Sequence, residues 1–534
     1  MKREGFFHVC LLGLFFFIIS SSGLLFAQTK AKDILNAGLY QELSSFDPHI
    51  SSTTDMDIHL LNVYEPLVGM SDEDPADFKP VLAESWSISE DGLTYTFNLR
   101  KGVKFSDGTD FNAEAAKFNF DRIFTLKKGG AYAVLRGIES VNVKGDYRIE
   151  IKFKELGPNL AFLLNGYMVS PSAVKNHSTK DDPWAETWLF NHTEGTAPYK
   201  LEEWTRGVRY RLVANPHYWR KWGKQFKTVD CRVIYEVDVQ RLMLERGDLD
   251  VAMSLSFDAL PALKRNPDLH IYEDESPSSI YLLFNHLTEP TKNILVRKAL
   301  AHAWNYEAFS IVRRGLAPRS DGPVPSAMLG KGYKPPFRYE YGLKKAKEYL
   351  VQAGYPDGFT INFLSQKGDE EKKMMFDIFQ NDLAKIGVKC NLFEKTWVGL
   401  VETTKDKLLM SDPKNAMHII SLYVSSTPFT PWKLVYRVYG TPAQMDKPFG
   451  GALNMGYYSN PKVDDYTTKA LSSTHPQKAL EFWRKANEEL INDYASIPTV
   501  NRMVIVGMRK DIQGYKFRAN FQPGTCRYYD LSRR

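Results

Sequence analysis

The residue types that carry catalysis are scattered along this chain and form no recognisable catalytic group. The sequence has no phosphate-binding loop of the Gly-x-x-x-x-Gly-Lys-Ser/Thr type, no Gly-x-Gly-x-x-Gly turn and no Gly-x-Ser-x-Gly elbow. The 11 histidines include no His-Glu-x-x-His helix, and no two cysteines stand at a zinc-binding spacing. Carboxylate pairs on distant segments are invisible in one sequence. In a chain of 534 residues, these missing motifs favour binding over catalysis, so we expect no catalytic residue, no metal site and no cofactor.

The composition of the chain argues against some classes of binding partner. The chain has 69 Lys+Arg and 63 Asp+Glu, a formal net charge of only +6, which gives little support for binding to nucleic acid or to an anionic membrane. The composition figure that stands out is the 13% of aromatic residues. At ~100 to 200 residues per domain, the length predicts two to four domains with sizeable cores.

The first 27 residues carry the pattern of a secretory signal peptide. A basic pair, Lys2 and Arg3, precedes the apolar run 6–19, and Ala27 is the small residue before the expected cut. The apolar run is shorter than the ~20 residues of a membrane helix. Cleavage after Gly23 and an uncleaved N-terminal anchor are the alternatives. We therefore expect a mature chain that acts in the periplasm.

Three cysteines remain after such a cut. Cys231, Cys390 and Cys526 permit at most one internal disulfide in an oxidising compartment, and the sequence does not say which pair would form it. Burial as free thiols is the alternative.

Local patterns predict the elements that would hold a binding site. Residues 93–100 alternate apolar and polar side chains, as a half-buried strand does, and Asn112 is placed to cap a following helix. Segments 345–364 and 376–393 each contain a helical repeat of apolar residues followed by an apolar, strand-like run. Because helices and strands alternate in the second half, we expect α/β layering there.

Short sequence words occur along nearly the whole mature chain. They read Leu-Ala-Glu-Ser-Trp (82–86), Asp-Gly-Leu-Thr-Tyr-Thr-Phe (91–97), Leu-Arg-Lys-Gly-Val-Lys-Phe (99–105), Gly-Thr-Ala-Pro-Tyr-Lys-Leu (195–201), Asn-Pro-His-Tyr-Trp (215–219), Gly-Asp-Leu-Asp (247–250), Ala-Gly-Tyr-Pro-Asp-Gly (353–358) and Tyr-Ser-Asn-Pro-Lys-Val-Asp (458–464). In these words and their order, the chain resembles family 5 extracellular solute-binding proteins, the periplasmic receptors for peptides, nickel complexes and related solutes that serve ABC importers.

The resemblance implies an α/β fold of the two-lobed periplasmic-binding-protein type, of the large cluster C class, with an extra domain in the first lobe. The implied division is a signal peptide at 1–27, a lobe I core domain at 28–60 plus 191–282 plus 501–534, an extra domain at 61–190 and lobe II at 283–500. It also implies a receptor that is not an enzyme. Its partners would be a small solute and an inner-membrane ABC permease, with no nucleic acid, and the chain would be a monomer.

The resemblance also shows where this sequence departs from the family pattern. In peptide-binding members, a segment of the second lobe carries an aspartate that pairs with the peptide's α-ammonium group. An ungapped placement puts Ser425 at that position, and no Asp or Glu occurs from Pro413 to Gln444. Losing one partner of a buried charge pair costs ~2 to 5 kcal/mol. The site should therefore select poorly for a free α-amine, unless Asp47, Asp55 or another acid replaces the aspartate.

Seven ligand-binding candidates follow from the resemblance: Trp397, Tyr423, Ser425, Ser44, Ser45, Phe46 and Tyr132. Trp397 matches a family position whose aromatic side chain commonly faces the cavity, and the three residues 44–46 match the first-lobe loop that lines the cleft. For each aromatic candidate the alternative is a packing role, above all for Phe46 and Tyr132.

Two classes of ligand and two further functions stay open at this point. The ligand is either a peptide or modified peptide with a different charge anchor, or a neutral or anionic solute such as an oligosaccharide or a metal chelate, held by aromatic stacking and hydroxyl groups. The other functions are a secreted hydrolase on the same scaffold and a periplasmic sensor or chaperone-like binder.

Overall fold

The structure of the chain is a computed structural model that describes residues 33–52, 58–71, 77–330, 332–424, 430–441, 453–473, 475–518 and 525–534. The predicted signal peptide, Asp55 and Ser425 lie outside these residues. Within them, no helix combines the length and the apolar character needed to cross a membrane.

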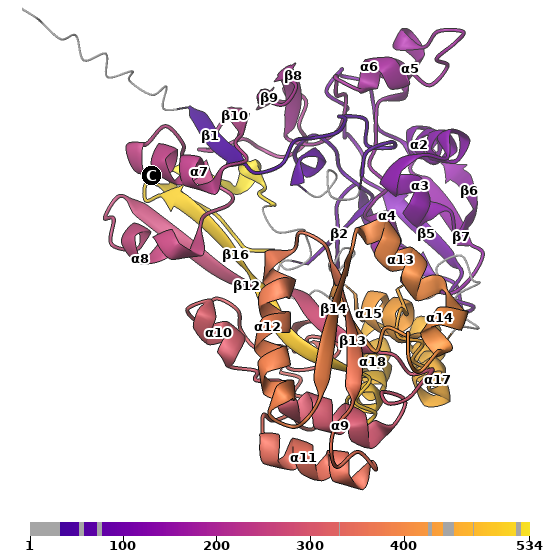
Figure 1. The fold of residues 1–534 in the computed structure, drawn as a ribbon. Helices are drawn as coiled ribbons and strands as arrows, with labels where there is room; N and C mark the ends of the chain where they lie inside the picture. The colour runs from indigo at the N-terminus through magenta and orange to yellow at the C-terminus, as the bar shows by residue number, and fades with distance from the viewer. Residues whose placement is uncertain are drawn as a thin grey trace, which may run out of the picture.

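One continuous sheet runs through both lobes (Figure 1). In the described part of the chain it has ten strands, in the order β14 (Lys389–Lys395), β13 (Thr360–Gln366), β15 (Ile419–Val424), β12 (Leu269–Phe284), β16 (Ser496–Arg509), β11 (Val251–Ala252), β1 (Ile34–Leu39), β10 (Thr228–Val233), β9 (Arg209–Ala214) and β8 (Tyr199–Thr205). Strands β13, β14 and β15 are parallel, and so are β1, β10 and β11.

Two long antiparallel strands, β12 and β16, join the lobes (Figure 1). Their ladder begins at Leu269 opposite Arg509 and ends at Leu283 opposite Ser496. Its register shifts on either side of Ser279, near the middle of β12. The predicted lobe boundaries, 282/283 and 500/501, both fall inside these two strands.

The extra domain carries a separate antiparallel sheet of β4 (Ala83–Ile88), β5 (Thr94–Leu99), β7 (Arg148–Phe153) and β6 (Ile138–Gly145), beside the short pair β2 (Val68–Met70) and β3 (Phe78–Pro80). Tyr95, Phe97 and Leu99 of β5 are buried, which confirms the predicted alternation. The Asn112 side chain accepts a hydrogen bond from Ala115 N at 2.9 Å, so the predicted helix cap is also confirmed. The helices of the first lobe are α2 (Ala113–Leu126), α3 (Gly129–Leu135), α4 (Asn159–Leu163), α5 (Pro171–His177), α6 (Glu186–Leu189), α7 (Val237–Arg246) and α8 (Leu260–Leu263).

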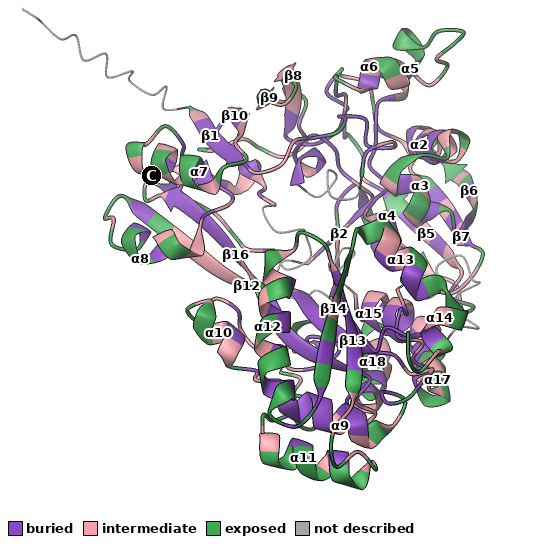
Figure 2. Cartoon of the chain, in the orientation of Figure 1, coloured by how far each residue is buried: buried purple, intermediate pink, exposed green. Residues whose placement is uncertain are grey.

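Helices cover the sheet of the second lobe. They are α9 (Ile294–Ala303), α10 (Ala308–Val312), α11 (Leu343–Gln352), α12 (Glu370–Ala384), α13 (Trp397–Lys405), α14 (Lys407–Ser411), α15 (Pro431–Tyr439), α17 (Pro461–Leu471) and α18 (Pro476–Asn492). Both segments predicted to run from helix to strand do so, as α11 into β13 and α12 into β14, which confirms the α/β class. Figure 2 shows the inner faces of these helices buried and their outer faces exposed.

The three remaining cysteines are buried free thiols, which confirms the alternative to an internal disulfide. Burial raises the pKa of both Cys231 and Cys390 to about 12, which keeps these thiols protonated and unreactive.

Candidate ligand-binding cleft

The carboxyl ends of parallel strands from both lobes define the candidate site. In the second lobe, β13 and β14 end in register at Gln366 and Lys395, and β15 ends beside them at Val424. In the first lobe, β1 and β10 end in register at Leu39 and Val233. Ligands of open α/β sheets bind at this edge, where the connecting loops diverge. Residues directly after these strands are therefore the first candidates for contact with a solute.

An aromatic and cationic cluster forms where the two edges meet. Tyr40 follows β1 in the first lobe, Tyr423 lies near the end of β15 in the second lobe, and Arg502 lies on β16 between them. The Arg502 guanidinium carbon stands 5.0 Å from the centre of the Tyr423 ring, a cation–π distance. The pKa of Tyr40 is raised by burial and then by Tyr423, while Arg502 opposes this. The three side chains thus share one electrostatic environment across the two lobes.

Arg502 shares its ion-pair partner, Glu371, with a second arginine. Its Nε lies 3.8 Å from Glu371 Oε2, and Glu371 Oε1 lies 3.8 Å from Nη2 of Arg313. Burial lowers the pKa of Arg502, but Tyr423 and Glu371 outweigh it, so the pKa is raised and the guanidinium stays charged. A second carboxylate, Asp369, also acts on Arg502, but it is itself paired with Lys372 at 3.1 Å. The two arginines therefore share the charge of Glu371, which favours an anionic group of a solute.

Trp397 stands at the same edge of the second lobe. It is the first residue of α13, directly after β14, and Thr396 caps the helix by accepting a hydrogen bond from Gly399 N at 3.3 Å. Its side chain is 43% exposed. Because Trp397 is fixed at the start of a helix and is largely exposed, its ring is available to stack on a solute.

The first-lobe loop places its three candidates differently. Ser44 is exposed, whereas Ser45 is buried and its hydroxyl accepts a hydrogen bond from Asp47 N at 3.0 Å. Phe46 is fully buried and meets Trp204 and Tyr210 edge-on, at centroid distances of 5.2 and 5.4 Å. Ser45 and Phe46 therefore shape this loop from within, and Ser44 is the loop residue that solvent reaches.

Tyr132 lies beside this loop, on α3. The Gly130 amide of the same helix donates a hydrogen bond to Ser51 O at 2.8 Å, which fixes α3 against the loop. Tyr132 is half-buried against the first-lobe core. The structure thus places α3, the helix that carries Tyr132, against Ser51 of the first-lobe loop, while Trp397 and Tyr423 belong to the second lobe.

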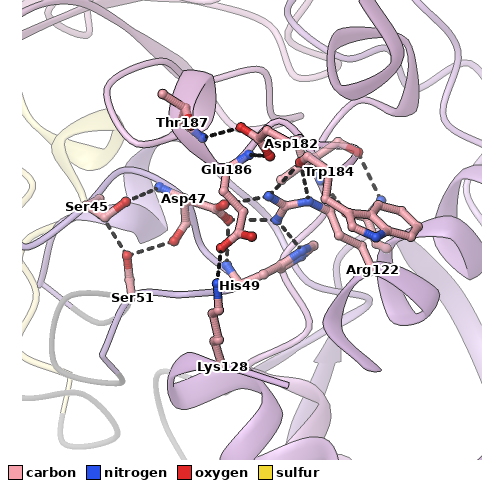
Figure 3. Close-up of polar contacts among 12 residues, drawn as sticks. Ser45, Asp47, His49, Ser51, Arg122, Lys128, Asp182, Trp184, Glu186 and Thr187 are labelled. Carbon is pink, nitrogen blue, oxygen red and sulfur yellow. Dashed lines mark hydrogen bonds and ion pairs between the residues drawn. The ribbon is translucent and has the colours of Figure 1, made fainter. Parts of the chain in front are cut away.

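Asp47 is occupied by an ion pair (Figure 3). Arg122 Nη1 donates to Asp47 Oδ1 at 2.8 Å and Nη2 donates to Oδ2 at 2.6 Å, and both side chains are fully buried. The same guanidinium donates to Trp184 O and to His49 Nδ1. Burial, and then Arg122, lowers the pKa of His49 to about 4, so the ring is a neutral acceptor. Asp47 therefore has no free oxygen for a ligand amine.

The sequence patterns did not indicate Tyr40, Arg502 or Glu371. Arg502 stands alone in an otherwise apolar run, Thr499 to Gly507, apart from Asn501, and a lone charge in such a run is a signal that could have been used. Tyr40 directly follows a buried strand, which is also a usable signal once strand β1 is recognised.

The comparisons with known proteins bear on the whole chain. Residues 77–446 match the family described as bacterial extracellular solute-binding proteins, family 5, middle region. The chain belongs to this family. The prediction of a family 5 solute-binding protein of an ABC importer is thereby confirmed at the level of the family.

Relatives of this family 5 protein cover nearly all of its length. The glutathione-binding protein GsiB of Salmonella typhimurium is 27% identical over 511 residues, which is 93% of this chain and 94% of that relative. The structure of HbpA2 from Haemophilus parasuis superposes with a TM-score of 0.82 at 23% identity, over 94% of this chain and 100% of the other. DppA from Helicobacter pylori, solved with the peptide STSA, gives 0.71 at 24% identity, over 94% and 98%. These likenesses confirm the two-lobed periplasmic-binding-protein fold.

Proposed function

We propose that this family 5 protein is a periplasmic receptor that encloses a small acidic peptide or peptide-like solute between its lobes and delivers it to an inner-membrane ABC permease. It acts without catalysis: the solute prefers the closed arrangement of the lobes, and the permease recognises that arrangement. The candidate residues at the cleft are Tyr40, Tyr423, Arg502 and Trp397, together with Ser44, Ser425 and Tyr132.

The cluster of Tyr40, Tyr423 and Arg502 is the observation that carries this proposal. It joins the two lobes at the carboxyl ends of their strands, and it presents a guanidinium between two phenols. Arginine binds a carboxylate through two parallel hydrogen bonds, which fixes the orientation of the solute as well as its charge. Of the two acids named above as possible amine anchors, Asp55 lies outside the described residues, and Asp47 is paired with Arg122. A solute anchored by its carboxylate fits this arrangement better than one anchored by its amine.

Glutathione is the first solute to test, because it is a small peptide with two carboxylates and because GsiB is named for binding it. Calorimetric titration should give saturable binding of glutathione, and weaker binding of its diethyl ester, in which both carboxylates are neutral. Small-angle scattering during the same titration should show a decrease in the radius of gyration. An oligosaccharide or nickel chelate that closes the lobes while acidic peptides do not would contradict the proposed ligand class.

Arg502→Gln is the variant that tests the anchor. Removing a charged hydrogen-bond partner costs ~1.5 to 3 kcal/mol, so affinity for glutathione should fall about tenfold or more. Arg509→Gln is the matched control, because it changes an arginine on the same strand at the far end of the ladder with β12. Equal losses in both variants, or equal binding of the ester and the acid, would exclude Arg502 as the anchor.

We also propose how the receptor is exported, processed and divided into lobes. The signal peptide would be removed near Ala27, and the mature monomer would divide at the boundaries given above, with the strands β12 and β16 as the connection between lobes. Mass spectrometry of the periplasmic fraction gives the mature N-terminus. Turnover of a peptide or glycoside by the purified protein would favour the hydrolase alternative instead.

A further inference from the structure

A second cavity lies away from the cleft, where the extra domain meets the last helices of the second lobe. It has a volume of about 250 Å³. One wall comes from the sheet and the α4 segment of the extra domain, and the other from α15, α17 and α18. Aromatic side chains on its two walls are Phe78, Trp86 and Tyr95 on one side and Trp432 and Trp483 on the other. None of the residues that we assign to the cleft lines it.

Contacts with neighbouring rings fix the aromatic side chains of the cavity. Trp86 lies against Phe97 at a centroid distance of 6.3 Å, and Tyr95 meets Phe153 edge-on at 5.5 Å. Trp432 stands 5.2 Å from Phe162 of α4, an edge-on contact. Rings fixed in this way from behind do not need to move before a ligand enters. The Trp432–Phe162 contact also joins the second lobe to the first beside the cavity.

The lining specifies the chemistry of a ligand. Among the described residues, Asp77 is the one charged residue in the lining and no Lys or Arg contributes, so these residues offer an anion no partner. The hydroxyl of Thr430 is buried in the lining and has no hydrogen-bond partner within the described part of the chain. A dry apolar cavity of about 150 Å³ is large enough to bind benzene. A cavity of 250 Å³ therefore accommodates a ring system of one or two rings that donates one hydrogen bond to Thr430.

We propose that this cavity is a second ligand site, separate from the cleft, which binds a small uncharged aromatic molecule carrying a hydrogen-bond donor. Its walls belong to both lobes, so a bound ring contacts both at once. Such a ligand stabilises the lobe arrangement in which the two walls face each other, and its binding is linked to closure around the solute. The site is independent of which solute occupies the cleft.

Indole is the probe, because it is flat and uncharged and its N–H can donate to the Thr430 hydroxyl. Calorimetric titration of the purified full chain with indole should give saturable binding. Ala479→Trp fills the cavity from α18, where Ala479 is half-buried in the lining, and should weaken indole binding about tenfold or more. Gln477→Trp is the matched control, because Gln477 is exposed on the same helix and does not line the cavity; its indole affinity should stay within twofold of the wild type.

A second cavity-filling variant and a measurement of glutathione binding complete the test of the cavity. If Ala479→Trp does not fold, Leu471→Trp fills the same cavity from the end of α17. Glutathione binding should persist in the filled variants, and saturating indole should change glutathione affinity without abolishing it. The proposal is overturned if wild-type protein shows no saturable indole binding, if the filled and control variants bind indole equally, or if glutathione displaces indole competitively. A failure of glutathione binding alone would reject the proposed cleft ligand and leave this site untouched.

Discussion

At the scale of single residues, the fully buried pair of Asp47 and Arg122 decides what the first-lobe loop can do. Removing both charges from water is costly, and the cost is offset only because the two bonds are short and the remaining guanidinium protons find Trp184 O and His49. Such a pair cannot release its carboxylate to a ligand without leaving a buried arginine unpaired. Its role is to hold the loop that carries Ser44 and Ser45.

Asp47→Asn should lower the free energy of unfolding by ~3 to 5 kcal/mol, because it leaves Arg122 charged, buried and without its anion. Urea unfolding followed by circular dichroism measures this. Asp465→Asn is the control: its ion pair with Lys469 is exposed, and the loss there should be at most ~1 kcal/mol. If Asp47→Asn kept its stability and lost affinity for peptides with a free amine, Asp47 would be the amine anchor after all.

Trp397→Ala should weaken solute binding while changing the free energy of unfolding by less than ~0.5 kcal/mol, since exposed side chains contribute little to stability. Calorimetric titration and thermal unfolding measure the two effects. Val398→Ala is the matched control, because Val398 is the next residue on α13 and is 63% exposed. A large drop in melting temperature for Trp397→Ala would instead assign this ring to packing between the lobes.

At the scale of elements, local patterns were enough to place many helices and strands. The alternation in β5, the Asn112 cap and the runs from α11 into β13 and from α12 into β14 all depend on residues close in sequence. The cluster of Tyr40, Tyr423 and Arg502 could not be derived in this way. Tyr40 is hundreds of residues from the other two, and the order of strands in the sheet brings the three together.

The strands β12 and β16 connect the lobes, and their ladder is imperfect at one place. The register of β12 against β16 shifts between Glu275 and Ser279, and Pro277 in this interval has no amide hydrogen to donate to a ladder. Asn501 on β16 is hydrogen-bonded to β12 on either side of this register shift: its Nδ2 donates to Glu275 Oε1, and its Oδ1 accepts from Ser279 Oγ. A ladder with an irregular register can bend at lower cost than a regular one, so we expect the lobes to bend at this place.

Hydrogen exchange should therefore find the amide of Ser276, which precedes Pro277, exchanging about tenfold or more faster than the amides of 281–283, which are paired on both sides by β15 and β16. Mass spectrometry of peptic fragments measures the difference. The regular part of the same ladder, 269–275, serves as an internal reference. Uniform protection along the whole of β12 would argue that the lobes bend at some other point.

At the scale of the whole molecule, each lobe holds a histidine in a neutral state. His49 lies in the first lobe and His286 in the second, where its Nε2 faces Ala495 O at 3.1 Å. Burial, and then Arg297, lowers the pKa of His286 to about 3, while the pKa of His49 is lowered to about 4. In the unfolded chain both rings titrate near pH 6.5. The unfolded state therefore binds more protons than the folded state throughout the window between these values.

The stability that these two histidines contribute is complete above pH 6.5 and is lost as the pH falls toward 4 and 3. At pH 5 the loss should be roughly 2 kcal/mol for each, since each pH unit inside the window costs about 1.4 kcal/mol. Urea unfolding of the wild type and of His286→Gln at pH 7 and at pH 5 measures it. Because the glutamine amide nitrogen can take the place of Nε2 and donate to Ala495 O, and because glutamine does not titrate, the variant should lose roughly 2 kcal/mol less between the two pH values. An identical loss in both proteins would mean that His286 is already protonated in the folded chain, and the acid sensitivity would then have to come from other groups.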